Sequence, residues 1–339
     1  MANKRIYYAT QAVQLVPVNA NTNGSFTLGT AVYPRGLQSV GITTNFTLTQ
    51  LFELGQQELY DNVEGVPEIE VTLQKSLDGT VPLYLLCMGG TETNYGSGKN
   101  IGELANNRVN FMLGVFADTK LAAAGTPDSY VRCTGMYLSS IGYTFPLDGF
   151  ATEDVTLVGN SKKWSDGTFN GNFSETTPQT AKHAVRRINV DVAGSTIPAS
   201  IPGGNSAHLQ SINVRANLGR EAINELGKLA PYCRYVKFPL EVTSEFVTTA
   251  TEGDAVDADD FLSAGSCTLS KNLVDESIIV KICGTGGTDT MDVNLGTKNK
   301  LTSVNYTGGD TGGGNAQVTY SYQTFNFLKV NVNGTFASG

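Results

Sequence analysis

The sequence predicts a mainly β protein made of two tandem antiparallel β-barrel or β-sandwich domains, each with one short flanking α-helix. Three observations predict this class. Val, Thr and Tyr recur in short runs that Gly, Asn, Asp and Ser interrupt, a composition typical of strands and turns. The chain has 339 residues, more than one ordinary domain needs. One phrase also occurs twice, as LQSVGITTNFTLTQLFELG at 37–55 and LQSINVRANLGREAINELG at 209–227.

The repeated phrase belongs to a longer duplication. At an offset of 172 residues, the separation of Leu37 from Leu209, nine positions within 37–67 are identical in both copies. Chance would give about two identities, given average amino-acid usage. A second match, LSSIGYT at 138–144 with LTSVNYT at 301–307, follows in the same order at an offset of 163. Two matches in the same order indicate tandem copies of one fold.

The duplication divides the chain into a first domain at 1–164, a linker at 165–182 and a second domain at 183–339. The linker is rich in Gly, Ser, Thr and Asn, as connecting segments usually are. The second match also aligns Val155 with Val318 in the last part of each domain. Because its offset is smaller than the first, we expect the second domain to be shorter in its middle.

Alternating apolar and polar residues, bounded by turn residues, predict the strands of the first domain. In chain order they are a hairpin from 5–18 and 24–34, strands at 37–46, 67–79 and 107–118, and a closing hairpin from 130–149 and 151–164. About six or seven antiparallel strands result, which is enough for a sandwich or a small barrel.

A change of period predicts the flanking helix. In TLTQLFELGQQELYD, Leu51 and Phe52 fall on one helical face together with two further leucines. The matching segment of the second domain, LGREAINELGKLAP, places Ile223 and Leu226 on one face, and its final proline is expected to end the helix.

Charge and composition narrow the possible functions. The net charge is −8, and charged residues make up only 16% of the chain, below the roughly 25% that is usual. A low content of charged residues indicates a protein whose surface is partly covered in an assembly. The sequence has no basic stripe of the kind that a general nucleic-acid binder carries.

Motifs for catalysis or for metal and cofactor binding are missing from the sequence. Its two histidines, His183 and His208, have no ligand spacing beside them, and it contains neither a G-x-S-x-G elbow nor a Walker loop. The five cysteines form no C-x-x-C pair and indicate buried free thiols. We therefore expect a protein that is not an enzyme and has no cofactor. The N-terminal segment lacks a signal-peptide core, so we expect folding in the cytoplasm of the cell that makes the chain.

Two stretches of the first domain carry a resemblance. GLQSVGITTNFTLTQLFELGQQELYDNVEGVPEIEVTLQKSLDG at 36–79 and YTFPLDGFATEDVTLVGNSKKW at 143–164 resemble the tail tube proteins of tailed bacteriophages, and the second domain carries both in weaker form. The resemblance implies a β-barrel or sandwich with one helix, stacked as rings in which a continuous inner sheet lines a channel for DNA. The duplication departs from the commonest, single-copy pattern. If a ring holds six such domains, a two-domain chain fills it with three subunits in pseudo-sixfold symmetry.

The same hypothesis assigns a use to the acidic charge. An acidic channel repels phosphates and avoids the counterion release that favours DNA binding. The candidate lumen residues are Glu68, Glu70, Glu241 and Glu245, which alternatively are ordinary solvent-facing strand residues.

Apolar residues supply candidate contacts between subunits. Leu51, Phe52, Ile223 and Leu226 either pack on their own domain or also wedge against the next one in the ring. In the linker, Phe169 and Phe173 are candidates for an arm that docks on a neighbour.

The expected location is the virion tail. The expected partners are further copies of the chain and other tail proteins: a terminator, a baseplate or tip, a tape measure and, where the tail has one, a sheath. DNA would pass through without specific binding, and no membrane is involved. The alternatives are another virion ring component, such as a connector, terminator or decoration protein, and a carbohydrate-binding β-sandwich.

Overall fold

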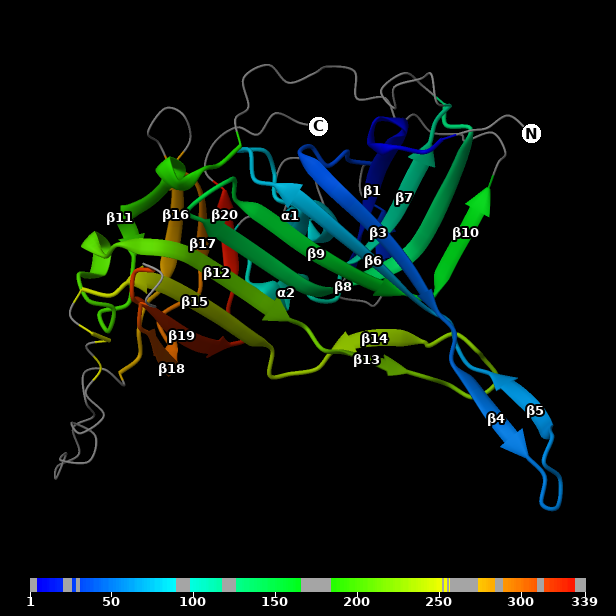
Figure 1. Cartoon of the computed structure of the whole chain (residues 1–339). Helices are drawn as coiled ribbons and strands as arrows, with labels where there is room; N and C mark the ends of the chain where they lie inside the picture. The colour runs from blue at the N-terminus through cyan, green and yellow to red at the C-terminus, as the bar shows by residue number, and fades with distance from the viewer. Residues whose placement is uncertain are drawn as a thin grey trace.

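The protein is a mainly β, sandwich-like assembly of antiparallel sheets, as the sequence predicts. The structure, a computed structural model, describes residues 5–20, 26–28, 31–89, 98–117, 126–165, 184–251, 253–254, 256, 274–283, 289–309 and 314–332. The described strands form two layers rather than a closed barrel (Figure 1).

Two halves with similar strands make up the chain. The first half, residues 5–165, contains β1 (Gln11–Ala20), β2 (Phe26–Leu28), β3 (Leu37–Asn45), β4 (Leu48–Phe52), β5 (Leu59–Glu64), β6 (Glu68–Ser76), α1 (Leu83–Met88), α2 (Ile101–Leu104), β7 (Arg108–Val115), β8 (Ser129–Pro146), β9 (Thr152–Gly159) and β10 (Ser161–Ser165). The second half, residues 184–332, contains β11 (Val190–Thr196), β12 (Leu209–Asn217), β13 (Arg220–Ile223), β14 (Cys233–Val236), β15 (Glu241–Thr249), β16 (Ile279–Cys283), β17 (Asp289–Asn294), β18 (Lys300–Thr307), β19 (Gln317–Phe325) and β20 (Lys329–Val332).

The strand pairing of the first half recurs in the second. One layer runs β3-β6-β9-β8 in the first half and β12-β15-β19-β18 in the second. The other layer runs β1-β7-β8-β10 and β11-β16-β17-β20. The long β8 serves both layers, whereas the second half divides the same path into β17 and β18 around Gly296, which has a φ of +77°.

The two halves join edge to edge. The C-terminal part of β8 pairs with β12, from Ser140↔Asn217 to Pro146↔Ser211, so that one run of eight strands, β3-β6-β9-β8-β12-β15-β19-β18, crosses the whole molecule. In this junction Tyr143 and Val214 are fully buried. We call this run the long sheet.

The register of the long sheet corrects one alignment made from the sequence. In the first half Val155 pairs with Ile141, whose counterpart in the second half is Val304. Val304 pairs with Tyr320, so the counterpart of Val155 is Tyr320 rather than Val318. β19 therefore lies 165 residues after β9, and the connection from Val304 to Tyr320 is two residues longer than the one from Ile141 to Val155. The first offset is correct at β3 and β12, which lie 172 residues apart.

The flanking helices predicted within 47–61 and 218–231 are wrong. Both segments are β-hairpins, β4–β5 and β13–β14. The repeated Glu-Leu-Gly is their turn: Gly55 and Gly227 have φ of +90° and +85°, and the preceding Glu carbonyl accepts a bond from the residue after glycine. A turn with positive φ at its third residue needs glycine and cannot continue a helix. The described α-helices are instead α1 and α2, both in the first half.

The short helix α1 is held in the core by a buried carboxylate. Glu153 of β9 is fully buried and accepts hydrogen bonds from the backbone N–H groups of Leu83 (2.5 Å) and Tyr84 (2.9 Å) and from the hydroxyl of Tyr143 (2.9 Å). Burial raises the pKa of Glu153, and the nearby charge of buried Lys75, whose own pKa burial lowers, opposes that rise. The carboxylate thus satisfies N–H groups that the first turn of a helix leaves without partners.

The prediction of buried free thiols is confirmed for two of the described cysteines, Cys87 and Cys133. Of the other described cysteines, Cys233 is a partly buried free thiol, and Cys283 is partly buried. Burial raises the pKa of Cys133 to about 11, which keeps the thiol protonated near neutral pH.

Candidate assembly surfaces

The long sheet has one apolar face and one polar face because its side chains alternate. On β6, Ile69, Val71 and Leu73 are buried in the core, whereas the residues between them are not. The strands β9, β12, β15 and β19 alternate in the same way, and buried residues of β8 lie opposite buried residues of β12 across the junction. We call the polar side of the long sheet the open face.

The four candidate lumen carboxylates all lie on the open face. Glu68 and Glu70 belong to β6, and Glu241 and Glu245 to β15. Glu241 is exposed and accepts a hydrogen bond from the Nε2 of Gln323 at 2.6 Å. Glu68 and Glu241 are structurally equivalent. Each is the first residue of its strand, and they pair with the equivalent residues Asn45 and Asn217.

Acidic groups outnumber basic groups on the described part of the open face. Sequence reasoning missed a fifth carboxylate, Asp154 of β9, whose Oδ1 accepts a bond from the Nε2 of Gln74 at 2.9 Å. The basic side chains there are Arg215 of β12 and Lys300 of β18, and Lys300 is ion-paired with Asp275 at 2.9 Å. The alternation of β9 was the signal for Asp154, because it directs Glu153 and Asp154 to opposite faces.

A shallow hollow marks the open face where the two halves meet. It lies over β8, β12 and β15, and its lining includes Asp154, Arg215 and Glu241. Gly142 helps to form the hollow because it has no side chain at the centre of the junction, where it pairs with Arg215. The surface there is polar and suits water and ions more than an apolar ligand.

The hairpin β13–β14 of the second half docks on the first half. Arg220 donates hydrogen bonds to the carbonyl oxygens of Leu138 (2.6 Å) and Ala105 (2.7 Å), and its guanidinium lies 5.1 Å from the ring centroid of Tyr137. Burial lowers the pKa of Arg220 to about 10, and burial is also the main cause that raises the pKa of Tyr137 to about 12. The Arg220 side chain thus holds the hairpin of the second half on the first half, in a contact that is largely shielded from water.

A second arginine of that hairpin reaches a candidate lumen residue. The Nη1 of Arg234 lies 2.9 Å from the Oε1 of Glu68, and its Nε donates to the Oδ1 of Asn160 at 3.2 Å. Arg234 is buried, whereas the side chain of Glu68 is half exposed. Glu68 is therefore ion-paired within the chain, and its charge is partly compensated.

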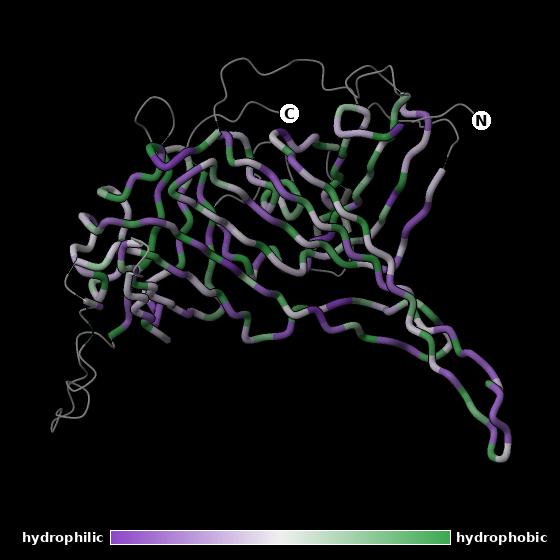
Figure 2. The backbone as a smooth tube through the Cα atoms, in the orientation of Figure 1, coloured by the Kyte–Doolittle hydropathy of each residue, from purple (hydrophilic) through white to green (hydrophobic). Residues whose placement is uncertain are grey.

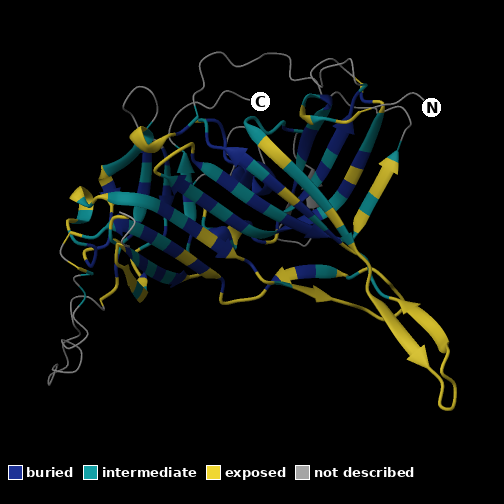
Figure 3. Cartoon of the chain, viewed as in Figure 1, coloured by how far each residue is buried: buried dark blue, intermediate teal, exposed yellow. Residues whose placement is uncertain are grey.

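The equivalent hairpin of the first half, β4–β5, projects away from the body of the molecule (Figure 1). Every residue of both its strands is exposed (Figure 3), although Figure 2 shows hydrophobic stretches along it. Its exposed apolar side chains are Leu48, Leu51, Phe52, Leu54, Leu59, Tyr60 and Val63. A lone two-stranded hairpin is at best marginally stable in water, so this apolar surface is suited to a covered position.

The four candidate contact residues lie on these hairpins and not on helices. Leu51 and Phe52 are 42% and 65% exposed, and Ile223 and Leu226 are 45% and 104% exposed. The expectation that they pack on their own domain is wrong for this structure. Phe169 and Phe173, and the linker that contains them, lie outside the described residues apart from Ser165, the last residue of β10.

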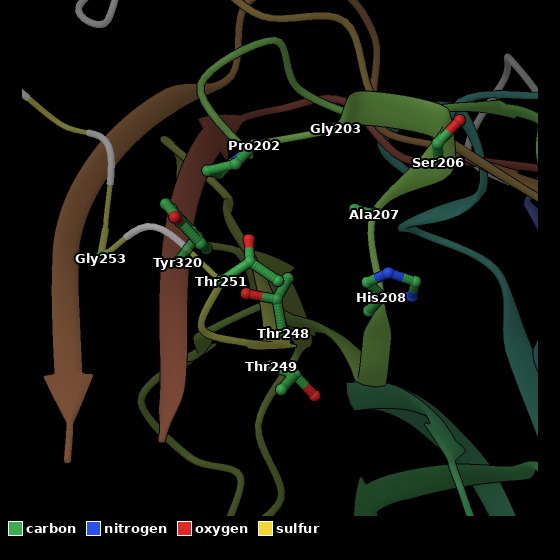
Figure 4. Close-up of a pocket in the computed structure, with 10 residues that line it drawn as sticks. All are labelled: Pro202, Gly203, Ser206, Ala207, His208, Thr248, Thr249, Thr251, Gly253 and Tyr320. Carbon is green, nitrogen blue, oxygen red and sulfur yellow. The ribbon is translucent and has the colours of Figure 1, made fainter. Parts of the chain in front are cut away.

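One further pocket lies at an end of the second half. Threonine hydroxyls, backbone and His208 line it, and Figure 4 shows Tyr320 at its side. The hydroxyl of Tyr320 donates to the carbonyl oxygen of Asp254 at 2.7 Å, and burial raises the pKa of Tyr320 to about 12. Among the residues that the structure describes, neither a carboxylate nor a cysteine lines this pocket beside His208.

Metal ligands and membrane spans were sought over the described ranges only. In them, no three His, Cys, Asp or Glu side chains gather as a metal site would require. No helix in those ranges has the length and apolar character needed to cross a bilayer.

The chain was also compared with known proteins. No family model matches it, and no curated protein does.

Proposed function

We propose that the chain is a structural virion protein that polymerises into stacked rings, which together form the tail tube of a bacteriophage. The observation that carries the proposal is the long sheet. Two equivalent four-strand sets stand side by side in one chain and are joined edge to edge, as successive subunits of a ring would be. A closed ring requires equivalent interfaces around its axis.

Stoichiometry follows from this repetition. If six four-strand sets close the ring, three chains supply them in pseudo-sixfold symmetry. The domains at 1–164 and 183–339 are then quasi-equivalent positions of one ring, and the segment 165–182 connects them. A ring of six four-strand sets has six contacts between neighbouring sets. The β8–β12 junction inside each of the three chains supplies three of them, and contacts between chains supply the other three.

The polar open face suits the wall of the channel. Its carboxylates exceed its basic groups, and Glu70 and Glu245 extend the acidic surface over both halves. Repulsion between these groups and DNA phosphates would let DNA pass without adhering, since no counterions are released by contact. DNA is therefore a transported partner. The other partners that we propose are the tail terminator, the tip or baseplate, the tape measure and, in a contractile tail, the sheath.

The hairpin β4–β5 supplies a test of the contacts within the ring. If it docks on the next chain as β13–β14 docks on the first half, Leu48 takes the place of Arg220, which donates to carbonyl oxygens of the first half. Substituting Leu48→Asp then sets a carboxylate against carbonyl oxygens. Because Leu48 belongs to a fully exposed hairpin, the free energy of unfolding of the monomer should change by less than about 0.5 kcal/mol. The critical concentration for assembly, measured by sedimentation, should rise about tenfold or more.

The matched control is Thr49→Asp on the same hairpin. Its counterpart in the docked hairpin is Glu221, so an acidic side chain is already tolerated at that position. The control should assemble like the parent chain. Equal assembly of both variants would show that the hairpin is not buried between subunits.

Electron microscopy of the purified full-length chain tests the function itself. We expect hollow filaments of stacked rings at concentrations where the tube is stable. Isolated rings that do not stack would instead favour a connector or terminator, and a persistent monomer would contradict the proposal.

A further inference from the structure

The β8–β12 junction is a template for the two outermost strands of the long sheet. β12 corresponds to β3, because each carries a register shift at the same Leu-Gln-Ser, Leu37–Ser39 and Leu209–Ser211. β18 corresponds to β8, because each shifts register at an equivalent Leu-x-Ser, Leu138–Ser140 and Leu301–Ser303. The β8–β12 junction is therefore a pairing between the equivalent of β18 and the equivalent of β3.

Each outermost strand has one side without a partner in the described part of the chain: β3 pairs only with β6, and β18 only with β19. Sheet proteins usually block such edges with charges, prolines or very short strands. β3 has nine residues, none of them charged or proline, and β18 has eight, of which only Lys300 at its start is charged. These edges are open to pairing with another strand.

Exposure at the edges points to the occupant. Tyr306 of β18 is 51% exposed, whereas its counterpart in the junction, Tyr143, is 1% exposed. Phe46, which follows β3, is 72% exposed, whereas its counterpart Leu218 is fully buried and donates its N–H to the carbonyl oxygen of Ser139 at 2.9 Å. The residues left open at the two ends are those that the junction buries in the middle, so a second copy of this chain fits them.

We propose that β18 of one chain pairs antiparallel with β3 of the next chain, in the register that the β8–β12 junction sets. In that junction Gly142 pairs with Arg215 and Tyr143 with Val214. Moving these pairs to the equivalent strands sets Asn305 opposite Thr43 and Tyr306 opposite Ile42. This contact closes the rings of the proposed tube, and to that extent it rests on the proposed function.

The buried surface makes the contact favourable. Ile42 is half-buried in the single chain and would gain the cover that Val214 has. Phe46 would lose most of its exposed apolar surface, and burial of a large apolar side chain contributes about 1.5–3 kcal/mol. New ladder hydrogen bonds would satisfy backbone groups that the open edges leave to water.

Cysteine cross-linking tests the register. In the double variant Thr43→Cys/Asn305→Cys, the two thiols of one chain lie at opposite ends of the long sheet, about 30 Å apart at the usual strand spacing, so only different chains can be joined. Directly opposed residues place their Cβ atoms about 4.5–5.5 Å apart, against about 7–8 Å for the diagonal neighbour. The matched control is therefore Thr43→Cys/Thr307→Cys, which shifts one partner by two residues. The single variant Thr43→Cys controls for the five native cysteines.

The full-length variants are assembled, mildly oxidised and run on denaturing, non-reducing gels. We expect the double variant to give covalent dimers and trimers at least tenfold more abundant than in either control, with no larger species. Tubes seen by microscopy without this cross-link would overturn the proposed register and leave the tube proposal standing. Equal cross-linking of the shifted pair, or dimers from Thr43→Cys alone, would also overturn it. A ladder that continues beyond the trimer would support the pairing and contradict the three-chain ring.

Discussion

Replacing Phe46 with aspartate should abolish ring and tube assembly while leaving a folded monomer. In the single chain Phe46 is 72% exposed, so an acidic side chain there should cost the monomer less than about 0.5 kcal/mol. In the ring the residue takes the place that buried Leu218 has in the internal junction. An uncompensated buried carboxylate costs about 3–5 kcal/mol, which raises the critical concentration at each contact by about 10²- to 5 × 10³-fold.

Trp164→Asp is the matched control for this substitution. Trp164 is also a large, exposed aromatic residue, but it lies on β10, outside the long sheet. Sedimentation velocity and thermal unfolding measure assembly and folding in parallel. Tubes formed by Phe46→Asp at the parent concentration would contradict the edge-to-edge account, provided that the control also assembles.

The largest effect on stability is expected from Glu153→Ala. The substitution removes the acceptor of three hydrogen bonds, from the N–H groups of Leu83 and Tyr84 and from the hydroxyl of Tyr143, all of them buried. It also leaves buried Lys75 with one opposing charge fewer. We expect the free energy of unfolding, measured by urea titration, to fall by about 3–5 kcal/mol.

The neighbouring Asp154→Ala separates this network from a general loss of acidic charge. Asp154 carries the same type of charge, but it lies on the open face and makes one side-chain hydrogen bond to Gln74. Its loss should cost less than about 1 kcal/mol. Equal destabilisation by the two substitutions would show that the carboxylate of Glu153 has no special role in holding α1.

Most of the strand framework could be predicted from the sequence. The strand at 37–46, the alternating strand at 67–79 and the hairpin around Pro146 are all confirmed, because each combines local alternation with turn residues. The repeated Leu-Gln-Ser was also informative, since it marks a register shift that both halves share. These signals are local and do not depend on contacts between distant parts of the chain.

The predicted helices failed for a local reason. Leu51 and Phe52 fit a helical face, but two strands joined by a turn also account for the spacing, and Gly55 was the deciding residue. A glycine followed by polar residues in the middle of the segment favoured the turn. The four contact candidates were therefore found on the correct segments but assigned the wrong secondary structure.

The network around Glu153 and the junction between the halves were beyond prediction from the sequence. Glu153 lies about 70 residues from the N–H groups that it binds, and an acidic residue in a strand is normally solvated. Likewise, no pattern in β8 or β12 shows that they pair with each other. The placement of Glu68 and Glu70 on one face of their strand did follow from alternation, because the period of a strand fixes its faces.

A helical reconstruction of the assembled tube tests the central claim most directly. The account predicts three chains in each ring, a continuous inner sheet in which β18 of each chain meets β3 of the next, and the open face with Glu70 and Glu245 turned toward the channel. Six chains in each ring, or a channel wall with net positive charge, would contradict it.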